Sequence, residues 1–365
     1  DEKYMRMAIN LARKGLGMTS PNPMVGAVLV NNGKVVGKGY HKGPGQLHAE
    51  AVAIKECGVE AAGATLYVNL EPCCHTDKRT PPCTKEIIRS GVNRVVVGMI
   101  DPNPAVNGRG ISELIDAGIS VDKDILNVDA SRLNEIYTKF ITSNIPFVIL
   151  KSAASLDGKI ALSSGESRWI TGKVSRRYAH KLRSTVDAVM AGIGTVIADD
   201  PMLSVRHVKS KGGQPLRIIV DSKLRIPLTS KVLDVSTGQK TMVVTTRQSP
   251  AVKIKELENL GIRTVIADTR EDGEVSLQSL MNLLGKSGVA SILIEGGSEI
   301  NASALRECIV DKLVIIYSTR IIGGRDSVGI VGGHSPKSLD ESVFLKDVSV
   351  RRMGEDIIVE GYVRQ

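Results

Sequence analysis

The sequence predicts an α/β protein with two domains, and three observations support this prediction. Both halves of the chain alternate short apolar runs, rich in Val and Ile, with stretches whose apolar residues recur at helical spacing. At 365 residues the chain is long for one domain and comfortable for two. A polar segment at 142–146 ends in Pro146, and a new apolar strand follows it directly. We therefore expect one domain over 1–144 and another over 145–365.

The first half is predicted to be a sheet covered by helices on both faces. Apolar residues at helical spacing predict an amphipathic helix over 3–16, closed by Gly15 and Gly17. Asn32-Gly33 is a strong hairpin signal, because a two-residue turn of this kind needs positive φ at both positions. The other elements alternate, with strands expected at 25–30, 34–39, 65–69 and 94–99 and helices near 48–57, 83–90, 111–117 and 127–142. This alternation indicates a three-layer α/β sandwich.

The second half is predicted to be a larger α/β domain that does not repeat the first. Its expected strands cover 147–151, 188–193, 217–221, 241–245, 263–267, 291–295, 312–318 and 356–363. Helices are expected between most of these strands, at about 173–184, 252–260, 276–286 and 299–307.

Composition and charge favour an enzyme that acts on small anionic molecules. The chain has 48 Lys and Arg against 39 Asp and Glu, a formal net charge of +9. These cations are scattered without a run of five, and aromatic residues do not interleave with them, so nucleic-acid binding is disfavoured. No apolar run approaches the ~20 residues of a membrane span, and no secretory signal is visible. We therefore expect a cytoplasmic protein.

The stretch from His48 to Cys83 has the composition of a zinc site that activates water. The chain has five cysteines, and those at 73, 74 and 83 lie within eleven residues of one another. Such a cluster in a long chain favours a metal site over a disulfide framework. His48, Cys73 and Cys83 can supply three ligands and leave the fourth position to water. Glu50 is then the proton shuttle between this water and a leaving amine.

The spacing within this stretch constrains its geometry. Residues i and i+2 do not share a helix face, so His48 and Glu50 can meet at one metal only if His48 lies at the helix start. Pro82 places Cys83 at another helix start, where amide N–H groups favour a thiolate. The two remaining cysteines, at positions 57 and 308, lie in apolar helical contexts and are expected to be buried.

Two alternatives to this ligand set stay open on spacing alone. Deaminases generally carry Pro-Cys-x-x-Cys, whereas nine residues separate Cys73 from Cys83, and Cys74 or His75 competes as a ligand. Adjacent residues seldom both reach one tetrahedral metal, which favours Cys73 with Cys83. The other alternative is a structural zinc knot or a set of unrelated core thiols. A closed structural site usually has four Cys or His ligands, and Glu50 would then have no purpose.

Three segments of the second half are candidates for cofactor binding. Residues 151–159 follow a strand and are rich in small side chains, and the single tryptophan, Trp169, comes soon after, although a lone Trp is more often a core residue. Gly192-Ile193-Gly194 lacks the third glycine of a dinucleotide-binding motif and is weak evidence. Glu295–Ser298 closes an aliphatic strand and opens a helix, whose amides can bind phosphate, although a plain tight turn fits equally well.

Three motifs, His48-Ala49-Glu50, Glu71–His75 and Arg79–Cys83, resemble those of the bifunctional riboflavin biosynthesis deaminase/reductase family, and the resemblance covers nearly the whole chain. Members of this family use the long-spaced second cysteine, so the unusual spacing supports the resemblance. It implies a cytidine-deaminase-like α/β/α domain with one Zn²⁺, followed by a dihydrofolate-reductase-like domain that uses NADPH. It also implies phosphorylated pyrimidine substrates and a homo-oligomer, dimer or tetramer.

The resemblance implies two consecutive reactions. The first is zinc-dependent hydrolytic deamination of 2,5-diamino-6-(5-phosphoribosylamino)pyrimidin-4-one. The second is NADPH-dependent reduction of the ribosyl group of 5-amino-6-(5-phosphoribosylamino)uracil to ribityl. Three other hypotheses remain. The protein could be a deaminase without reductase activity, or a deaminase of the transfer-RNA type with an RNA-binding second half. The third hypothesis is a non-enzymatic interaction protein whose fold is stabilised by zinc.

The resemblance further implies which residues contact the ligands. Substrate contacts in the first domain would be Asn22, His41, Arg79, Asp101 and Asn103, although Asp101–Pro104 also has the composition of a plain turn. Substrate contacts in the second would be Ser167, Arg183, Leu203, Arg206 and Glu295, with the two arginines as phosphate clamps. Cofactor contacts would be Ala153, Trp169, Thr195, Asp199, Ser222, Gly297, Ser298, Glu299, Ile300, Asn301, Ala302 and Ser303. Lys151 and Glu295 are the candidates for proton transfer during the reduction.

Overall fold

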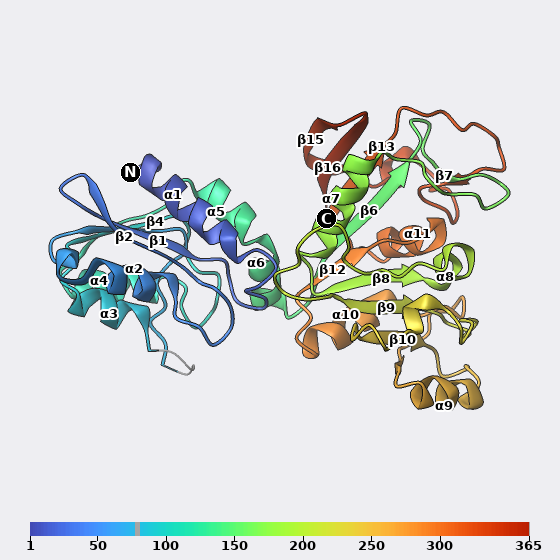
Figure 1. Ribbon diagram of the computed structural model, residues 1–365, viewed down its shortest axis with the longest axis horizontal. Coiled ribbons are helices and arrows are strands. Elements are labelled where there is room, and N and C mark those ends of the chain that lie inside the picture. The colour runs from blue at the N-terminus through green and yellow to red at the C-terminus, as the bar shows by residue number, and fades with distance from the viewer. Residues whose placement is uncertain (77–80, 365) are drawn as a thin grey trace. The chain divides into compact units, whose positions relative to one another are not determined.

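The computed structural model describes residues 1–76 and 81–364 (Figure 1). The chain divides into two units, Asp1–Asn144 and Ile145–Gln365, each with a sheet of its own. Among the described residues, no helix combines the length and the apolar character needed to cross a bilayer.

The first unit is built on a five-stranded sheet with the order β2-β1-β3-β4-β5. Its strands are β1 (Gly26–Asn31), β2 (Lys34–Tyr40), β3 (Thr65–Val68), β4 (Arg94–Val97) and β5 (Ser120–Asp122). Strand β1 pairs antiparallel with β2 and β3, whereas β3, β4 and β5 are parallel. The predicted hairpin is confirmed, because Asn32 and Gly33 both have positive φ between β1 and β2.

Helices cover both faces of this sheet, so the predicted three-layer α/β/α architecture is confirmed (Figure 1). One face carries α1 (Glu2–Ala12), α5 (Asn127–Leu133) and α6 (Glu135–Ser143). The other carries α2 (Ala49–Cys57), α3 (Cys83–Arg89) and α4 (Arg109–Asp116). Single 3-10 turns, η1 (Arg13–Gly15) and η2 (Gly58–Ala61), follow α1 and α2.

Glycines in the hairpin strands allow the helices to pack unusually close. A Cβ atom at Gly26 would lie 2.1 Å from the carbonyl oxygen of Ala8 in α1. One at Gly39 would lie 2.1 Å from the carbonyl oxygen of Ala49 in α2. No side chain fits in such a gap, so the two helices lie directly on the backbone of β1 and β2.

One predicted helix of the first unit is wrong in its length. Residues 127–142 form two helices, which separate at Asn134, where φ is −104° and ψ is 20°. The side chain of Asn134 explains the break, because it accepts a hydrogen bond from Met24 N at 2.8 Å and donates one to Met24 O at 3.1 Å. Strand β5 was not predicted, because it has only three residues and is mostly exposed.

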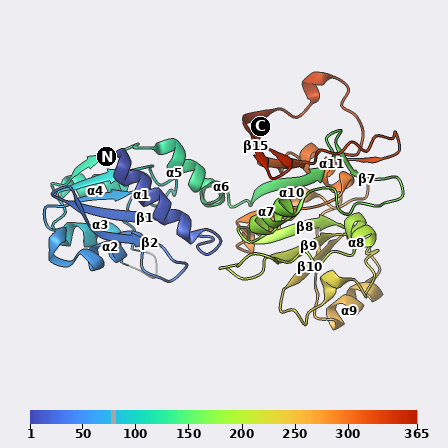
Figure 2. The ribbon, with the colours of Figure 1, turned by 45° about the horizontal axis from the view of Figure 1, so that its top comes forward.

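The second unit is built on a nine-stranded sheet with the order β11-β10-β9-β8-β12-β6-β13-β16-β15. The strands from β11 to β13 are parallel, and the last two pairs are antiparallel. Neighbouring strands β8, β9 and β10 can be followed in Figure 2. The nine strands are β6 (Phe147–Ala154), β8 (Ala188–Gly192), β9 (Leu216–Val220), β10 (Thr241–Thr245), β11 (Arg263–Ile266), β12 (Ser291–Ile294), β13 (Lys312–Tyr317), β15 (Leu345–Met353) and β16 (Asp356–Val363).

Every second side chain of the parallel strands belongs to a hydrophobic core, to which two helices also contribute. Val148, Leu150, Ile292 and Ile294 pack with apolar side chains of α10 (Leu277–Lys286) and α11 (Ser298–Arg306). The other helices are α7 (Lys173–Arg183), α8 (Ile193–Asp199) and α9 (Ala251–Asn259). Short elements complete the unit: β7 (Lys159–Ala161) pairs with β14 (Val328–Gly329), and η3 (Lys231–Leu233) and η4 (Leu339–Glu341) are 3-10 turns.

Several features of the second unit differ from the sequence-based predictions, among them the short strands β7 and β14, which were not predicted. Strand β15 was missed because its side chains are largely polar and exposed, so that no apolar alternation marks it. Helix α8 was missed because it has only seven residues and begins in a glycine-containing segment. Cys308 is exposed rather than buried, since it lies just beyond the end of α11, whereas Cys57 is buried as expected.

Candidate active sites

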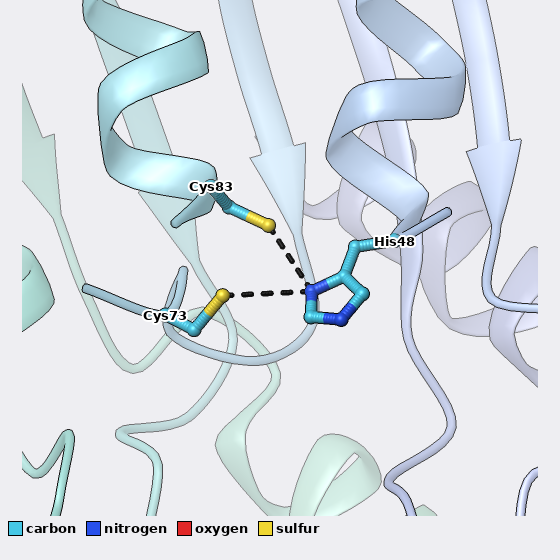
Figure 3. A group of neighbouring side chains, drawn as sticks. All are labelled: His48, Cys73 and Cys83. Carbon is cyan, nitrogen blue, oxygen red and sulfur yellow. Dashed lines mark hydrogen bonds between the residues drawn. The ribbon is translucent and has the colours of Figure 1, made fainter. Parts of the chain in front are cut away.

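His48, Cys73 and Cys83 converge in the first unit (Figure 3). The Nδ1 atom of His48 lies 3.2 Å from the Sγ atom of Cys83 and 3.5 Å from that of Cys73. The three ligand atoms all lie within 4.8 Å of one another. One nitrogen and two sulfur atoms at this separation match the ligands that zinc prefers, with a fourth position left for water.

The ends of secondary structure elements place these three side chains. His48 is the N-cap of α2, with φ −71° and ψ 162°, so the predicted position at the helix start is confirmed. Cys83 is the first residue of α3 and follows Pro82, as predicted. Cys73 comes shortly after β3 on the carboxyl side of the parallel strands. The N–H groups of a helix start favour a negative charge on the Cys83 sulfur.

Glu50 lies in the first turn of α2 and is only 3% exposed. Its Oε2 atom has no hydrogen-bond partner among the described residues. Burial, and next the nearby Cys73 sulfur, raise the pKa of Glu50. A buried carboxyl with an unused oxygen beside three soft ligands fits a zinc-bound water that exchanges protons with it.

Cys74 and His75 are not part of the converging group in the described portion of the chain. Cys74 packs instead against a small apolar cluster of Cys73, Cys83 and Val106. Burial raises the pKa of the Cys74 thiol, which disfavours the thiolate that a metal needs.

Asn22 and His41 lie next to this group. The Nδ2 atom of Asn22 is 3.2 Å from Nε2 of His41, and Nδ1 of His41 is 3.2 Å from the carbonyl oxygen of Leu47. Since a carbonyl only accepts, His41 donates through Nδ1, and its Nε2 accepts from Asn22. The His41 ring packs edge-to-face on His48, with ring centroids 5.4 Å apart. Both predicted substrate residues therefore border the ligand group.

Asp101 and Asn103 form hydrogen bonds within their own loop. Asp101 is 4% exposed, and its Oδ1 atom accepts from the Tyr137 hydroxyl and from Asn103 N, each at 2.9 Å. Burial raises the pKa of Asp101 to about 6. Asn103 Oδ1 in turn accepts from Ala105 N at 2.9 Å, which is typical of a turn. Arg79, the remaining predicted contact, lies outside the described residues.

Glu71 is a residue of this site whose role the sequence analysis did not find. It is 2% exposed, and its carboxylate accepts hydrogen bonds from three backbone N–H groups, those of Asp101 at 3.1 Å, Gly108 at 2.9 Å and Ile111 at 3.1 Å. Glu71 therefore holds the loop that carries Asp101 and the start of α4. Its place next to Pro72-Cys73 was visible in the sequence, but its partners are 30 to 40 residues away.

The second unit contains a cavity of about 1120 Å³. Most of the second-unit residues predicted as contacts line it: Lys151, Ala153, Ser167, Trp169, Arg183, Thr195, Asp199, Leu203, Arg206, Ser222, Glu295, Gly297, Ser298, Glu299, Ile300 and Ser303. Two residues of the predicted run, Asn301 and Ala302, do not line it. Asn301 is fully buried and donates a hydrogen bond from Nδ2 to the carbonyl oxygen of Ile330 at 2.8 Å.

A buried charge cluster lies on one wall of this cavity. Glu295 Oε1 is 2.6 Å from Arg183 Nε, and Glu295 Oε2 is 3.2 Å from Lys151 Nζ. Arg183 also donates from Nη2 to Glu295 Oε2 at 3.0 Å. Burial alone would raise the pKa of Glu295, but the adjacent Arg183 and Lys151 hold it well below its ordinary range. Glu295 is therefore a carboxylate that fixes two cations at the cavity.

Trp169 and Ser167 form another part of the cavity lining. Trp169 is 62% exposed, so it is not a core residue, and the guanidinium of Arg176 lies 4.5 Å from its ring centroid. The Ser167 hydroxyl donates to Asp199 Oδ1 at 2.7 Å and so links two predicted contacts. A flat indole face open to a cavity suits stacking against a planar ligand.

Three further residues near this cavity were not predicted: His180, Gln214 and Gln239. His180 lines the cavity, and each of the three bonds to the backbone of residues 203–206. No local motif marked them, since their partners are between 9 and 36 residues away. His180 is buried on α7 with Ser175 and Ala179, a position that becomes visible only once the helix is packed in the fold.

Comparison with known families assigns both units. Residues 1–99 match the family model of the cytidine and deoxycytidylate deaminase zinc-binding region, and residues 146–359 match that of the RibD C-terminal domain. The riboflavin biosynthesis protein RibD of Aquifex aeolicus is 42% identical over 359 residues, which are 98% of this chain and 97% of the relative. The protein of the same name from Escherichia coli is 36% identical over 368 residues, 98% of each chain.

Solved structures lead to the same family. RibD of Acinetobacter baumannii, form 1, superposes with a TM-score of 0.88 at 34% identity and covers 100% of this chain and 99% of its own. A Thermotoga maritima protein described as a diaminohydroxyphosphoribosylaminopyrimidine deaminase/5-amino-6-(5-phosphoribosylamino)uracil reductase has a TM-score of 0.86 at 34% identity. It covers 100% of this chain and 98% of its own.

Proposed function

This chain belongs to the RibD family of riboflavin biosynthesis proteins, and we propose that its two sites act in turn on one phosphorylated pyrimidine. The protein is a bifunctional enzyme, a zinc-dependent deaminase and an NADPH-dependent reductase. We assign the deaminase to residues 1–144 and the reductase to residues 145–365. The first substrate would be 2,5-diamino-6-(5-phosphoribosylamino)pyrimidin-4-one, and the second 5-amino-6-(5-phosphoribosylamino)uracil, in line with the description of the Thermotoga maritima relative.

In the deaminase we assign zinc to His48, Cys73 and Cys83, which converge within 4.8 Å. Bound zinc would lower the pKa of a water molecule toward about 7. Glu50 would accept a proton from this water and pass it to the 2-amino group, which leaves as ammonia while oxygen takes its place on the ring. The buried Oε2 atom of Glu50, which lacks a partner among the described residues, supports this assignment.

Substrate binding in the deaminase is assigned to polar residues around the ligand group. Asn22 and His41 would hold the ring or ribose hydroxyls, because they form a hydrogen-bonded pair beside His48. Asp101 and Asn103 would contribute from the loop that Glu71 holds, and Arg79 would pair with the phosphate.

In the reductase we assign NADPH to the cavity wall with Ala153, Trp169, Thr195, Asp199, Ser222 and the start of α11. Its hydride would go to C1 of the ribosyl group, and the C1–O bond of the ring would break to give the ribityl chain. Lys151 would donate the proton to the released oxygen, since Glu295 fixes its ammonium at the cavity. Ser167, Leu203 and Arg206 would hold the substrate, with Arg206 and Arg183 near its phosphate.

The convergence of His48, Cys73 and Cys83 around a buried Glu50 is the observation that carries the proposal. The test is to incubate the zinc-loaded protein with the diaminopyrimidinone and NADPH, and to measure ammonia and NADPH absorbance together. We expect one NADPH oxidised for each ammonia released. Ammonia release without NADPH oxidation would show that the protein is a deaminase only. If the protein neither releases ammonia nor oxidises NADPH, the substrate assignment is wrong.

We also propose that the enzyme is a cytoplasmic homo-oligomer, dimer or tetramer, without a nucleic-acid partner. All five cysteines lie in the described residues and none is part of a disulfide bond, which suits a reducing compartment. The edge strand β15 is largely exposed over nine residues and could pair with a second copy. Sedimentation analysis would show a monomer if the oligomer is wrong, and salt-dependent RNA retention would contradict the absence of a nucleic-acid partner.

A further inference from the structure

Residues 203–206 form a segment of the cavity wall that we name the strap. It lies between α8 and β9 and includes Leu203 and Arg206, both of which line the cavity. The strap has no regular secondary structure, and in the described parts of the chain no backbone–backbone hydrogen bond involves it. Yet Leu203, Ser204 and Val205 are only 2%, 7% and 6% exposed. Buried backbone groups need partners, so something else must satisfy them.

Side chains from distant parts of the unit supply these partners. Gln239 donates from Nε2 to Leu203 O at 3.3 Å, and Arg183 donates from Nη1 to Ser204 O at 2.9 Å. Gln214 bonds both backbone groups of Val205, accepting from its N–H at 2.7 Å and donating to its carbonyl oxygen at 3.1 Å. His180 Nδ1 accepts from the backbone N–H of Arg206 at 3.1 Å. Every residue of the strap is thus held by a side chain.

His180 and Arg183 lie on successive turns of one helix, α7, and so hold the strap from the same side. Arg183 is bound at its other edge to Glu295, which also holds Lys151. The strap is therefore connected through Arg183 to the residues that we assign to proton transfer. His180 must be neutral to accept through Nδ1, and its pKa is lowered to about 4 by burial and by the neighbouring Arg183 and Arg206.

We propose that His180, Gln214 and Gln239 are positioning residues of the reductase, which hold the strap so that Arg206 and Leu203 face the substrate. The proposal rests on the assignment of Arg206 to the substrate. The strap is pre-organised by these contacts, so the enzyme does not have to order it when the substrate binds. Loss of one contact should weaken substrate binding and leave the hydride step largely unchanged.

The test compares three variants of the full-length, zinc-loaded enzyme. His180→Ala removes the acceptor for Arg206 N, whereas His180→Asn places an amide oxygen where Nδ1 was. Lys181→Ala, at the next and exposed position of α7, is the matched control. We expect His180→Ala to raise the reductase KM for the uracil substrate by about tenfold with little change in kcat. His180→Asn should recover most of this loss, and Lys181→Ala should resemble the parent enzyme.

A variant at another contact of the strap tests the proposal without changing a buried side chain. Gln214 is exposed as a whole residue, so Gln214→Glu should fold normally. The carboxylate still accepts from Val205 N but cannot donate to Val205 O, and we expect a rise in KM of about threefold. Two internal controls accompany every variant. Deaminase kinetics report on the first unit, and NADPH binding, followed by the emission of the single tryptophan, Trp169, reports on the second.

Arg206→Ala separates this proposal from the assignment on which it rests. If Arg206→Ala leaves KM unchanged, the assignment of Arg206 to the substrate is wrong. If Arg206→Ala raises KM while His180→Ala and Gln214→Glu do not, the assignment stands and the positioning role is wrong. If His180→Ala lowers kcat or weakens NADPH binding, or if His180→Asn raises KM as much as His180→Ala does, His180 has a general structural role instead. Because His180 is proposed to act through Arg206, we expect the double variant His180→Ala/Arg206→Ala to have nearly the same KM as Arg206→Ala alone.

Discussion

The two active sites of this enzyme are built in different ways. In the deaminase, the three residues that we assign to zinc and the proposed proton shuttle lie within 36 residues of sequence, at the starts of α2 and α3 and after β3. In the reductase, the cavity is lined by residues from Lys151 to His334, and its charged centre joins β6, α7 and the end of β12. Chemistry at a metal depends on a few atoms in one place, whereas a dinucleotide and a sugar phosphate need a long surface. The first site is therefore local in sequence and the second is dispersed.

The sharpest test of this difference is to remove a single ligand of the local site. Cys83→Ser should lose zinc and all measurable deamination, because a hydroxyl is a poor zinc ligand compared with a thiolate. Metal content and ammonia release measure the effect. The reductase, assayed with the uracil substrate, should keep its activity. Cys74→Ser is the matched control and should keep both zinc and deamination, since Cys74 lies outside the ligand group. Zinc loss in Cys74→Ser would contradict the ligand assignment.

Glu50→Gln should show the next largest effect. The amide cannot accept the proton of the water, and we expect deamination to fall by about 10²–10⁴-fold while zinc remains bound. Steady-state ammonia release and metal analysis distinguish this variant from a ligand loss. Glu56→Gln, exposed on the same helix, is the control. A Glu50→Gln enzyme with full deaminase activity would contradict the assignment of Glu50 as the proton shuttle.

Removal of the carboxylate at the centre of the dispersed site should cost stability as well as activity. Glu295→Ala leaves Arg183 and Lys151 buried without their shared counter-charge, and we expect a loss of about 3–5 kcal/mol in the second unit. The single tryptophan, Trp169, lies in this unit, so urea unfolding followed by its fluorescence reports on this unit alone. Glu258→Gln, an exposed change in α9, should stay within about 0.5 kcal/mol of the parent. If Glu295→Ala unfolds at the same urea concentration as the parent, water must already solvate Arg183 and Lys151, and the counter-charge contributes little to stability.

Mild acid should weaken the second unit through His180. Its folded-state pKa of about 4 lies below the ordinary value of 6.5, so the unfolded chain binds the proton more readily between these values. The stabilisation is complete above pH 6.5 and is lost as the pH falls toward 4. From pH 7 to pH 5 this corresponds to about 1 kcal/mol, because solvent screens part of the full effect. The charged neighbours Arg183, Arg206 and Glu295 keep their charges over this range, and the ring of His207, 5.2 Å from that of His180, also lowers the pKa of His180. Tryptophan-detected unfolding of His180→Asn should have a smaller slope with pH, and an equal slope would exclude His180 as the cause.

The smallest effect is expected at Asn134, a residue that is distant in sequence from the deaminase site but holds one of its loops. Asn134 bonds both backbone groups of Met24, two residues after the assigned substrate residue Asn22. Asn134→Ala should raise the deaminase KM by about threefold to tenfold, because the loop loses these two bonds. Arg132→Ala, exposed on α5, is the control. Equal KM values in the two variants would show that Asn69, which also bonds Met24 O, suffices to hold the loop.

This comparison explains which features could be predicted from sequence. The hairpin at Asn32-Gly33, the helix starts at His48 and Cys83, and the strands of the parallel sheets all follow from local propensity and period. Strand β15 has no apolar period, and the break at Asn134 depends on Met24, which is 110 residues away. The same reason applies to Glu71 and Gln239, whose partners are set by the tertiary fold. Contacts between distant residues leave no local pattern to detect.

The glycine at position 39 has a consequence for how this enzyme can change. The backbone of Ala49 lies so close to Gly39 that no methyl group fits between them, and Ala49 stands between His48 and Glu50. Any larger residue at position 39 would push the start of α2 away from the sheet. His48 and the proposed proton shuttle, Glu50, would then move together, while Cys73 and Cys83, which belong to other segments, would stay in place. Variation in the outer strand of the hairpin is therefore constrained by the proposed zinc site, although none of the assigned ligands lies in this strand.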